Sequence, residues 1–171
     1  AQTSTGVTST INVTAVNDAP VLATGSVLAY TENQAASAIN AVITTADVDN
    51  ATLASGTVSI TANFAASEDT LGFVNVPATM GNIAGVYNAG TGVMSLTSAG
   101  ATATLAQWQA ALRAVTYANS SDAPSVLART VSYVVNDAAA NSNTVTSTIN
   151  LTAVNDAPVG TNKTVTTLED T

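Results

Sequence analysis

Short runs in which apolar and polar residues alternate with a period of two recur along this chain of 171 residues. Residues 145–153 form one such run, and residues 58–64 and 131–135 alternate in the same way. This period predicts half-buried antiparallel strands, because successive side chains of a strand point to opposite faces of the sheet. The turn residues Asn-Ala-Gly-Thr-Gly at 88–92 separate two further apolar runs and predict a hairpin. Many short strands separated by turns indicate an all-β, antiparallel β-sandwich.

One segment has a helical period instead. Thr104 and Gln107 have the spacing of a helix capping box, and Trp108 and Leu112 follow on one helical face. We therefore expect a short helix near residues 104–113. The single tryptophan is expected to fill the core of the domain rather than to form a binding platform.

A sequence of fifteen residues occurs twice in the chain. Residues 7–21 read VTSTINVTAVNDAPV and residues 145–159 read VTSTINLTAVNDAPV, so the two copies differ at one position. The offset of 138 residues (145 minus 7) predicts the length of one repeat. The predicted parts are the last strand and linker of a preceding repeat at 1–19, a complete repeat at 20–157 and the start of a following repeat at 158–171.

The composition excludes several kinds of chemistry. Cysteine and histidine are absent, which excludes disulfide bonds, thiol nucleophiles, histidine bases and the usual zinc ligands, so we do not expect an enzyme. Eleven acidic and three basic residues give a formal net charge of -8, so we expect no nucleic acid partner. No apolar run approaches the roughly 20 residues of a membrane-spanning helix, so we expect no membrane insertion and place any export signal outside this sequence.

The acidic residues lie beside Asn, Pro, Gly or other acids in predicted turns. Calcium takes about six to eight oxygen ligands, from carboxylates, Asn side chains and backbone carbonyls, which turns can bring together. The strongest local cluster is the sequence DVDN, in which Asp47 and Asp49 can turn two carboxylates toward one ion. The second element is the duplicated Asn-Asp-Ala-Pro linker, with Asn17 and Asp18 in one copy and Asn155 and Asp156 in the other.

Other acidic residues are further candidates for calcium binding. They are Glu32, Asp122, Asp137, Glu68 with Asp69, and Glu169 with Asp170. Each has a plainer interpretation, because Asp and Asn are common turn formers that form hydrogen bonds with their own backbone. Glu68 is interpreted as an ordinary surface residue. Neither an EF-hand loop nor a Gly-rich nonapeptide is present, so a calcium site has to form between segments that are distant in sequence.

Several segments carry a resemblance to a known family. The linker AVNDAPV resembles the inter-domain linker of cadherin-type domains, and DVDN resembles their Asp-x-Asp calcium motif. Residues 47–60, 87–122 and 129–143 are similar to cadherin-like tandem repeats of giant bacterial surface and secreted adhesins, of the RTX-adhesin type exported by type I secretion. The resemblance covers almost the whole chain. It implies a cadherin- or immunoglobulin-like β-sandwich, strung in series outside the cell, with Ca²⁺ as the cofactor.

The same resemblance implies which residues share an ion. An upper cluster would consist of Asn17, Asp18, Asp47, Asp49 and Asp137. A lower cluster would consist of Glu32, Asn155 and Asp156, with Asp122 as a possible fourth member. The sequence departs from the cadherin pattern at Ala19 and Ala157, where the linker usually carries a second Asn, and it lacks an evident Asp-Arg-Glu motif. Fewer calcium ions per junction than in cadherins are therefore implied.

The leading hypothesis is a calcium-stabilised structural extender repeat of an extracellular bacterial adhesin, which makes a chain of domains rigid for surface attachment or biofilm formation. Its partners would be the adjacent repeats of the same polypeptide, with identical molecules in trans as a further candidate. The alternative is a module for carbohydrate binding, cell binding or homophilic adhesion. Aromatic residues make up only 4% of the chain, and their patterns predict burial, which speaks against a glycan site. A glycosidase that uses Glu68 and Asp69 is the third hypothesis, and no cleft signal supports it.

Overall fold

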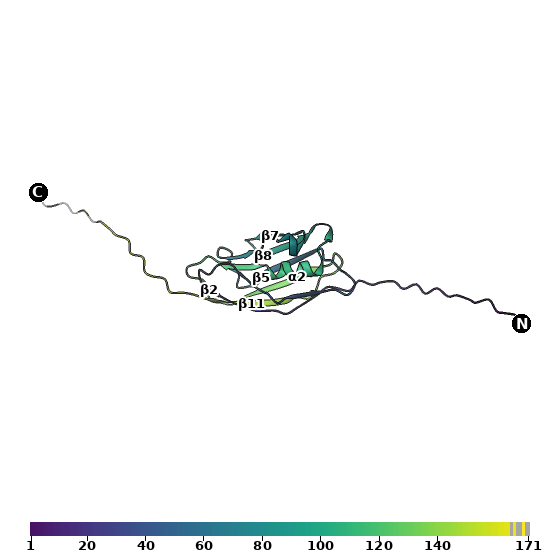
Figure 1. The fold of residues 1–171 in the computed structure, drawn as a ribbon. Coiled ribbons are helices and arrows are strands. Elements are labelled where there is room, and N and C mark those ends of the chain that lie inside the picture. The colour runs from purple at the N-terminus through teal and green to yellow at the C-terminus, as the bar shows by residue number, and fades with distance from the viewer. Residues whose placement is uncertain (165, 167–168, 170–171) are drawn as a thin grey trace.

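The computed structural model describes residues 1–164, 166 and 169. The strands and helices form one folded body, and the segments before β1 and after β11 leave it on opposite sides (Figure 1). The strands are β1 (Val21–Ala23), β2 (Val27–Thr31), β3 (Ser37–Ala38), β4 (Thr44–Ala46), β5 (Ser55–Ala62), β6 (Asp69–Gly72), β7 (Ile83–Asn88), β8 (Val93–Ser98), β9 (Thr116–Asn119), β10 (Arg129–Asn136) and β11 (Val145–Thr152). The helices are α1 (Pro77–Met80), α2 (Leu105–Arg113) and the 3-10 turn Ala99–Ala101.

The strands form three sheets. The largest has the order β2-β11-β10-β5-β8-β7, a second has the order β3-β9-β6, and a third pairs β1 with β4. Neighbouring strands are antiparallel except β11 and β2, which run parallel. The predicted all-β, sandwich-like fold with one short helix is confirmed. The parallel pair and the single turn of α1 were not predicted.

The alternating runs form strands at the predicted places. In β11, Val145, Ser147, Ile149 and Leu151 are buried while their neighbours are more exposed. β10 and β5 alternate in the same manner. The predicted hairpin is also present, because residues 88–92 connect β7 to β8 and the two strands pair over their whole length.

The predicted helix is α2, and its start has the predicted capping box. The Thr104 side chain accepts a hydrogen bond from the Gln107 amide, and the Gln107 side chain accepts one from the Thr104 amide at 2.9 Å. Trp108 is fully buried and donates from its indole to the Leu53 carbonyl at 3.0 Å. Gly56 of β5 lies against this ring, since a Cβ at that position would come within 3.1 Å of it. Trp108 is therefore a core residue, as predicted.

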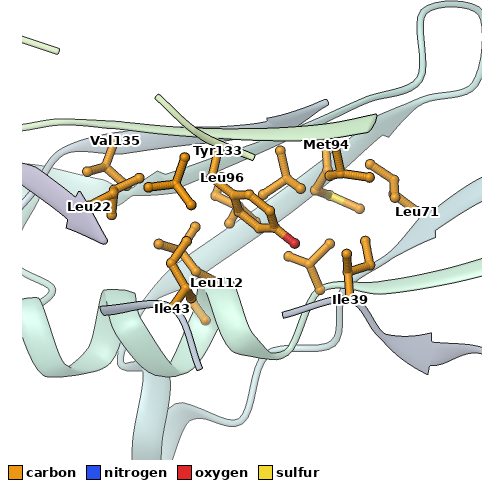
Figure 2. Packing of buried hydrophobic residues seen from close by; sticks show 14 of the residues in the cluster. Leu22, Ile39, Ile43, Leu71, Met94, Leu96, Leu112, Tyr133 and Val135 are labelled. Carbon is orange, nitrogen blue, oxygen red and sulfur yellow. The ribbon is translucent and has the colours of Figure 1, made fainter. Parts of the chain in front are cut away.

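The core lies between the six-stranded sheet and α2. Figure 2 shows Leu96 and Tyr133 from the sheet on one side of the cluster and Ile43 and Leu112 on the other. All four side chains are fully buried. The hydroxyl of Tyr133 lies inside the core next to the Ser147 side chain, and burial raises the pKa of Tyr133.

Candidate cation sites at the two ends of the domain

The first candidate site is at the end of the domain where the N-terminal segment enters. The turn after β4 is organised by Asp47, whose Oδ1 accepts hydrogen bonds from the backbone amides of Asp49 at 3.2 Å and Asn50 at 2.9 Å. Such a bond from a side chain to the backbone two or three residues later is the usual reason for Asp in a turn. The other oxygen of Asp47, Oδ2, is buried and has no hydrogen-bond partner among the described residues. The turn therefore leaves one carboxylate oxygen of Asp47 available to bind a cation.

The N-terminal linker is bound to this end of the domain. The Asn17 side chain donates to Asp137 Oδ2 at 2.9 Å, across 120 positions of sequence. The Asp18 amide donates to Asp49 Oδ2 at 3.1 Å. Two carboxylates from separate turns thus hold two successive residues of the linker.

The Asn50 amide nitrogen is surrounded by oxygens from three segments. Its Nδ2 lies 3.0 Å from Asn17 Oδ1, 3.2 Å from Asp49 Oδ1 and 3.4 Å from Asp137 Oδ2. An amide nitrogen has only two hydrogens to donate, so the three oxygens exceed what it can satisfy. Oxygens that converge in this way are the arrangement that a hard cation requires. Rotation of the Asn50 amide would add its own oxygen to the set.

Asp137 is the most enclosed carboxylate of this group, with an exposed fraction of 9%. Its Oδ1 accepts from the backbone amides of Ala139 at 2.7 Å and Ala140 at 2.6 Å. The hydrogen bond from the Ala140 amide, with smaller contributions from Asn17 and Ala139, holds the pKa of Asp137 below its ordinary value. The charged form of Asp137 is therefore favoured, and its Oδ2 faces the linker.

The structure brings the five residues of the predicted upper cluster together, joined by Asn50. Within the described residues there is nevertheless no group of three or more Asp, Glu, His or Cys side chains placed to hold one ion. A cation at this end would therefore need the amide oxygens of Asn17 and Asn50 beside the carboxylates. Those residues fit calcium in chemistry, because all of the ligands are oxygens and one carboxylate oxygen is buried without a partner.

The second candidate site lies at the opposite end of the domain. Glu32 is 4% exposed, and its Oε2 accepts from the Val154 amide at 2.8 Å. Its Oε1 is buried and has no partner among the described residues. A buried carboxylate oxygen without a partner is costly, so it is the second place where the structure fits a cation.

The other members of the predicted lower cluster do not gather at Glu32. Asp122, Asn155 and Asp156 are exposed, and none of them forms a hydrogen bond with Glu32 in the described part of the chain. The Asn155 side chain bonds only locally, to the Asp156 carbonyl at 3.2 Å. Of the remaining candidate pair Glu169 and Asp170, Asp170 lies outside the described residues, as do positions 165, 167, 168 and 171 of the predicted third repeat.

A buried ion pair was missed by the sequence reasoning. Asp69 and Arg129 are 1% and 0% exposed, and Arg129 Nε lies 3.2 Å from Asp69 Oδ2. The Tyr117 hydroxyl donates to Asp69 Oδ1 at 2.6 Å and the Asn119 side chain does so at 2.8 Å. Burial, and next the hydrogen bond to Asp69, raise the pKa of Tyr117. The Ala65 amide also donates to Asp69 Oδ2 at 2.8 Å, so four protein groups hold Asp69 in a closed structural network.

The same network fixes a loop of the domain. Arg129 Nη1 donates to the carbonyls of Ser125 at 2.5 Å and Leu127 at 2.6 Å. Asp69 is therefore neither a free calcium ligand nor one of two carboxylates across a cleft, which corrects the interpretation of Glu68 with Asp69. The signal was present in the phase of the strands, since Asp69 shares a face with Leu71 and Arg129 with Val131.

The chain matches no family model, no curated protein and no solved structure. Neither helix of the described residues has the length and apolar character that crossing a membrane requires.

Proposed function

We propose that this chain is a calcium-stabilised structural extender module of an extracellular tandem-repeat adhesin at a bacterial surface. The observation that carries this proposal is the set of oxygens around the Asn50 amide nitrogen, which come from the linker, from the turn after β4 and from the turn after β10. A cation at that point would join the linker directly to the body of the domain.

The negative charges of this region favour the binding of a divalent cation. Asp18, Asp47, Asp49 and Asp137 lie within one hydrogen-bonded group, and no Lys or Arg of the described residues takes part in it. The whole chain has a formal net charge of -8, so the local repulsion adds to a general one. Calcium would offset that repulsion and provide a partner for Asp47 Oδ2. The residues that would hold it are Asp47, Asp49, Asp137, Asn17 and Asn50.

The shape of the molecule supports a role as an extender. The N-terminal and C-terminal segments leave at opposite ends of the domain (Figure 1). The linker at each end has the same sequence, so copies of this module joined in series would be connected by the same kind of joint. A joint held by an ion has fewer accessible orientations than a free linker of the same length. Rigidity of the series would then depend on calcium.

Thermal unfolding in millimolar calcium and in chelator tests the proposal. Extracellular modules bind calcium at about 0.1 to 1 mM, and an ion at tenfold excess over its dissociation constant adds about 1.4 kcal/mol per site to the free energy of unfolding. We expect a higher midpoint in calcium, and we expect Asp49→Asn to remove most of the difference. Glu68→Gln removes the same charge elsewhere and should keep it. Equal midpoints of the unmodified chain in calcium and chelator would rule the proposal out.

The alternative of a glycan-binding module finds less support. Trp108, Tyr117 and Tyr133 are 0% exposed and Tyr30 is 1% exposed, so none of them presents a ring on which a sugar can stack. Phe64, Phe73 and Tyr87 pack against the core and are partly buried. No observation favours this alternative over the structural role.

A further inference from the structure

β7 is an edge strand of the six-stranded sheet and pairs with β8 alone. The hydrogen bonds on the other side of β8 show which backbone groups of β7 are unpaired. The Ser98 amide donates to the Ala54 carbonyl at 2.9 Å, and the Ile60 amide donates to the Gly92 carbonyl at 3.0 Å. In an antiparallel sheet each residue directs its amide and carbonyl to one neighbouring strand, and successive residues alternate. The even-numbered residues of β8 therefore face β5, and its odd-numbered residues face β7.

The same alternation identifies the open backbone groups of β7. Val86 lies opposite Ser95 of β8, so its amide and carbonyl are directed to β8. Gly85 and Tyr87, the residues on either side of Val86, direct their amides and carbonyls to the open side of the sheet. No strand, turn or side chain of the described residues bonds to these open groups. Gly85 is also exposed, so a further strand can reach the edge.

β7 lacks the usual protection of an edge strand. Its sequence IAGVYN contains neither proline nor a charged residue, and its pairing with β8 has no bulge. Proteins ordinarily protect an edge with charges, proline or bulges, because an open edge accepts another strand. The strand at the other edge of the same sheet, β2, is followed directly by Glu32. β7 is therefore the edge at which addition of a strand meets the fewest obstacles.

The distribution of charge favours a second copy of this chain as the partner. Residues 70–112 contain no Asp, Glu, Lys or Arg, although the chain as a whole has a formal net charge of -8. Two copies that approach each other repel over most of their surfaces, because both are acidic. The repulsion is smallest where uncharged regions meet, and β7 lies within the longest uncharged region of the sequence.

A second β7 also matches the open groups of the first. If a two-fold axis passes between the two Val86 residues, Gly85 of each copy lies opposite Tyr87 of the other, and each such pair can exchange two main-chain hydrogen bonds. The Tyr87 hydroxyl donates to the Asp69 carbonyl at 3.0 Å, so the Tyr87 side chain faces the core and the adjacent Val86 faces the outer side of the sheet. Val86 is 71% exposed, and in this register the two valines form an apolar cross-strand pair.

We propose that β7 of one molecule pairs antiparallel with β7 of a second copy of this chain, so that two six-stranded sheets become continuous. This inference goes beyond the proposed function and does not depend on calcium. Main-chain hydrogen bonds of Gly85 and Tyr87 would provide the affinity, and the Val86 pair would set the register. A two-fold contact uses the same surface of both molecules, so the association ends at the dimer.

Sedimentation equilibrium of the full chain in chelator tests the proposal. We expect the mean mass of the unmodified chain to rise with concentration toward that of a dimer and no further. Val86→Lys and Val86→Glu should each raise the dissociation constant by at least about tenfold, because two like charges would lie directly opposite each other. An equimolar mixture of the two variants should associate more tightly than either variant alone, because lysine would then lie opposite glutamate. Val86 is exposed in the single molecule, so neither change should affect the fold.

Val27→Lys is the matched control, because Val27 is 68% exposed and lies in β2, at the other edge of the same sheet. It changes the net charge as Val86→Lys does and should leave the association unchanged. The proposal is wrong if the unmodified chain remains monomeric up to millimolar concentration, or if Val27→Lys weakens the association as much as Val86→Lys. A mixture of Val86→Lys and Val86→Glu that associates no better than the separate variants would also overturn it, since the two Val86 residues would then not face each other.

Discussion

The two copies of the fifteen-residue sequence lie in different environments within one molecule. In the copy at 145–159, the strand is buried between β10 and β2, while the linker after it is exposed. In the copy at 7–21, the strand is exposed, while the linker is bound to the turns at one end of the domain. Each copy therefore makes one half of the contacts that the sequence is capable of making.

This difference separates the contacts that depend on neighbouring residues from the contacts that depend on the tertiary fold. In both linkers the Asn side chain donates to the carbonyl of the following Asp, at 3.0 Å for Asn17 and 3.2 Å for Asn155. That bond depends on neighbouring residues and forms in either environment. The bonds of Asn17 to Asp137 and of Asp18 to Asp49 need a domain end to receive them. A junction in a series of modules would combine the two halves, with a paired strand followed by a bound linker.

The largest loss of stability is expected at Arg129, which lies next to the paired copy of the repeated sequence. Arg129 faces Ile149 in the register of β10 and β11, and it is the buried partner of Asp69. Arg129→Met should cost about 3 to 5 kcal/mol, because it leaves the Asp69 carboxylate buried without its counter-charge. Chemical denaturation measures this cost. Arg113→Met, which removes a single bond to the Ile43 carbonyl, should cost far less, and equal costs would contradict the assignment.

The strand halves of the two copies can be compared directly. Ile149→Ala should lower the free energy of unfolding by about 2 to 5 kcal/mol, because it leaves a cavity in the core. Ile11→Ala, the same substitution in the exposed copy, should change it by less than about 0.5 kcal/mol. The pair is measured by denaturant unfolding at a concentration where the chain is monomeric. A large effect of Ile11→Ala would show that residues 7–14 pack onto their own domain.

The two linkers should differ in the same direction as the two strands, with a smaller difference in the free energy of unfolding. Asn17→Ala removes the bond to the enclosed Asp137 and should cost about 0.5 to 1.5 kcal/mol. Asn155→Ala removes only the local bond to Asp156 and should have little effect. Thermal unfolding of the two variants side by side measures the difference. Equal losses would mean that the bound linker adds nothing to stability.

The smallest effect concerns pH. Because hydrogen bonds hold the pKa of Asp137 in the folded state below its ordinary value of 3.8, the unfolded chain binds the proton more readily. The contribution of Asp137 is present above pH 3.8 and is lost as the pH falls through the lower folded-state pKa. Asp137→Asn should therefore lose less stability than the unmodified chain upon acidification through this range. Parallel curves of midpoint against pH would contradict this expectation.

Much of the fold was predictable because its signals are local. The capping box at Thr104, the hairpin turn at 88–92 and the alternation in β11 each depend on residues within one short segment. The parallel pairing of β11 with β2 was not predictable in this way, because the period of a strand does not specify its neighbour. The side-chain pattern predicts that a segment is a strand, whereas the order of the strands in a sheet depends on the whole chain.

For the candidate site, the sequence pointed to individual residues but not to their contacts. Residue type and turn context pointed to Asp47, Asp49 and Asp137, which the structure brings to one end of the domain. Asn50 belongs to the local DVDN motif, but its central position depends on contacts with three separate segments, which that motif does not specify. Asp69 was misjudged because its place next to Glu68 was interpreted as a turn, although Asp69 shares a strand face with the buried Leu71. Its partner Arg129 lies sixty positions later in the chain.

The most direct test of the account is a calcium titration followed by NMR on the side-chain amides of Asn17, Asn50 and Asn155. Asn155 is an internal control, because it has the same neighbours in sequence as Asn17 but in the described residues bonds only to the adjacent Asp156. We predict saturable shifts for Asn17 and Asn50, with Asn155 unchanged at the same calcium concentration. Shifts of equal size for Asn17 and Asn155, or no saturable shift at any of the three, would contradict the claim that the bound linker forms a calcium-dependent joint.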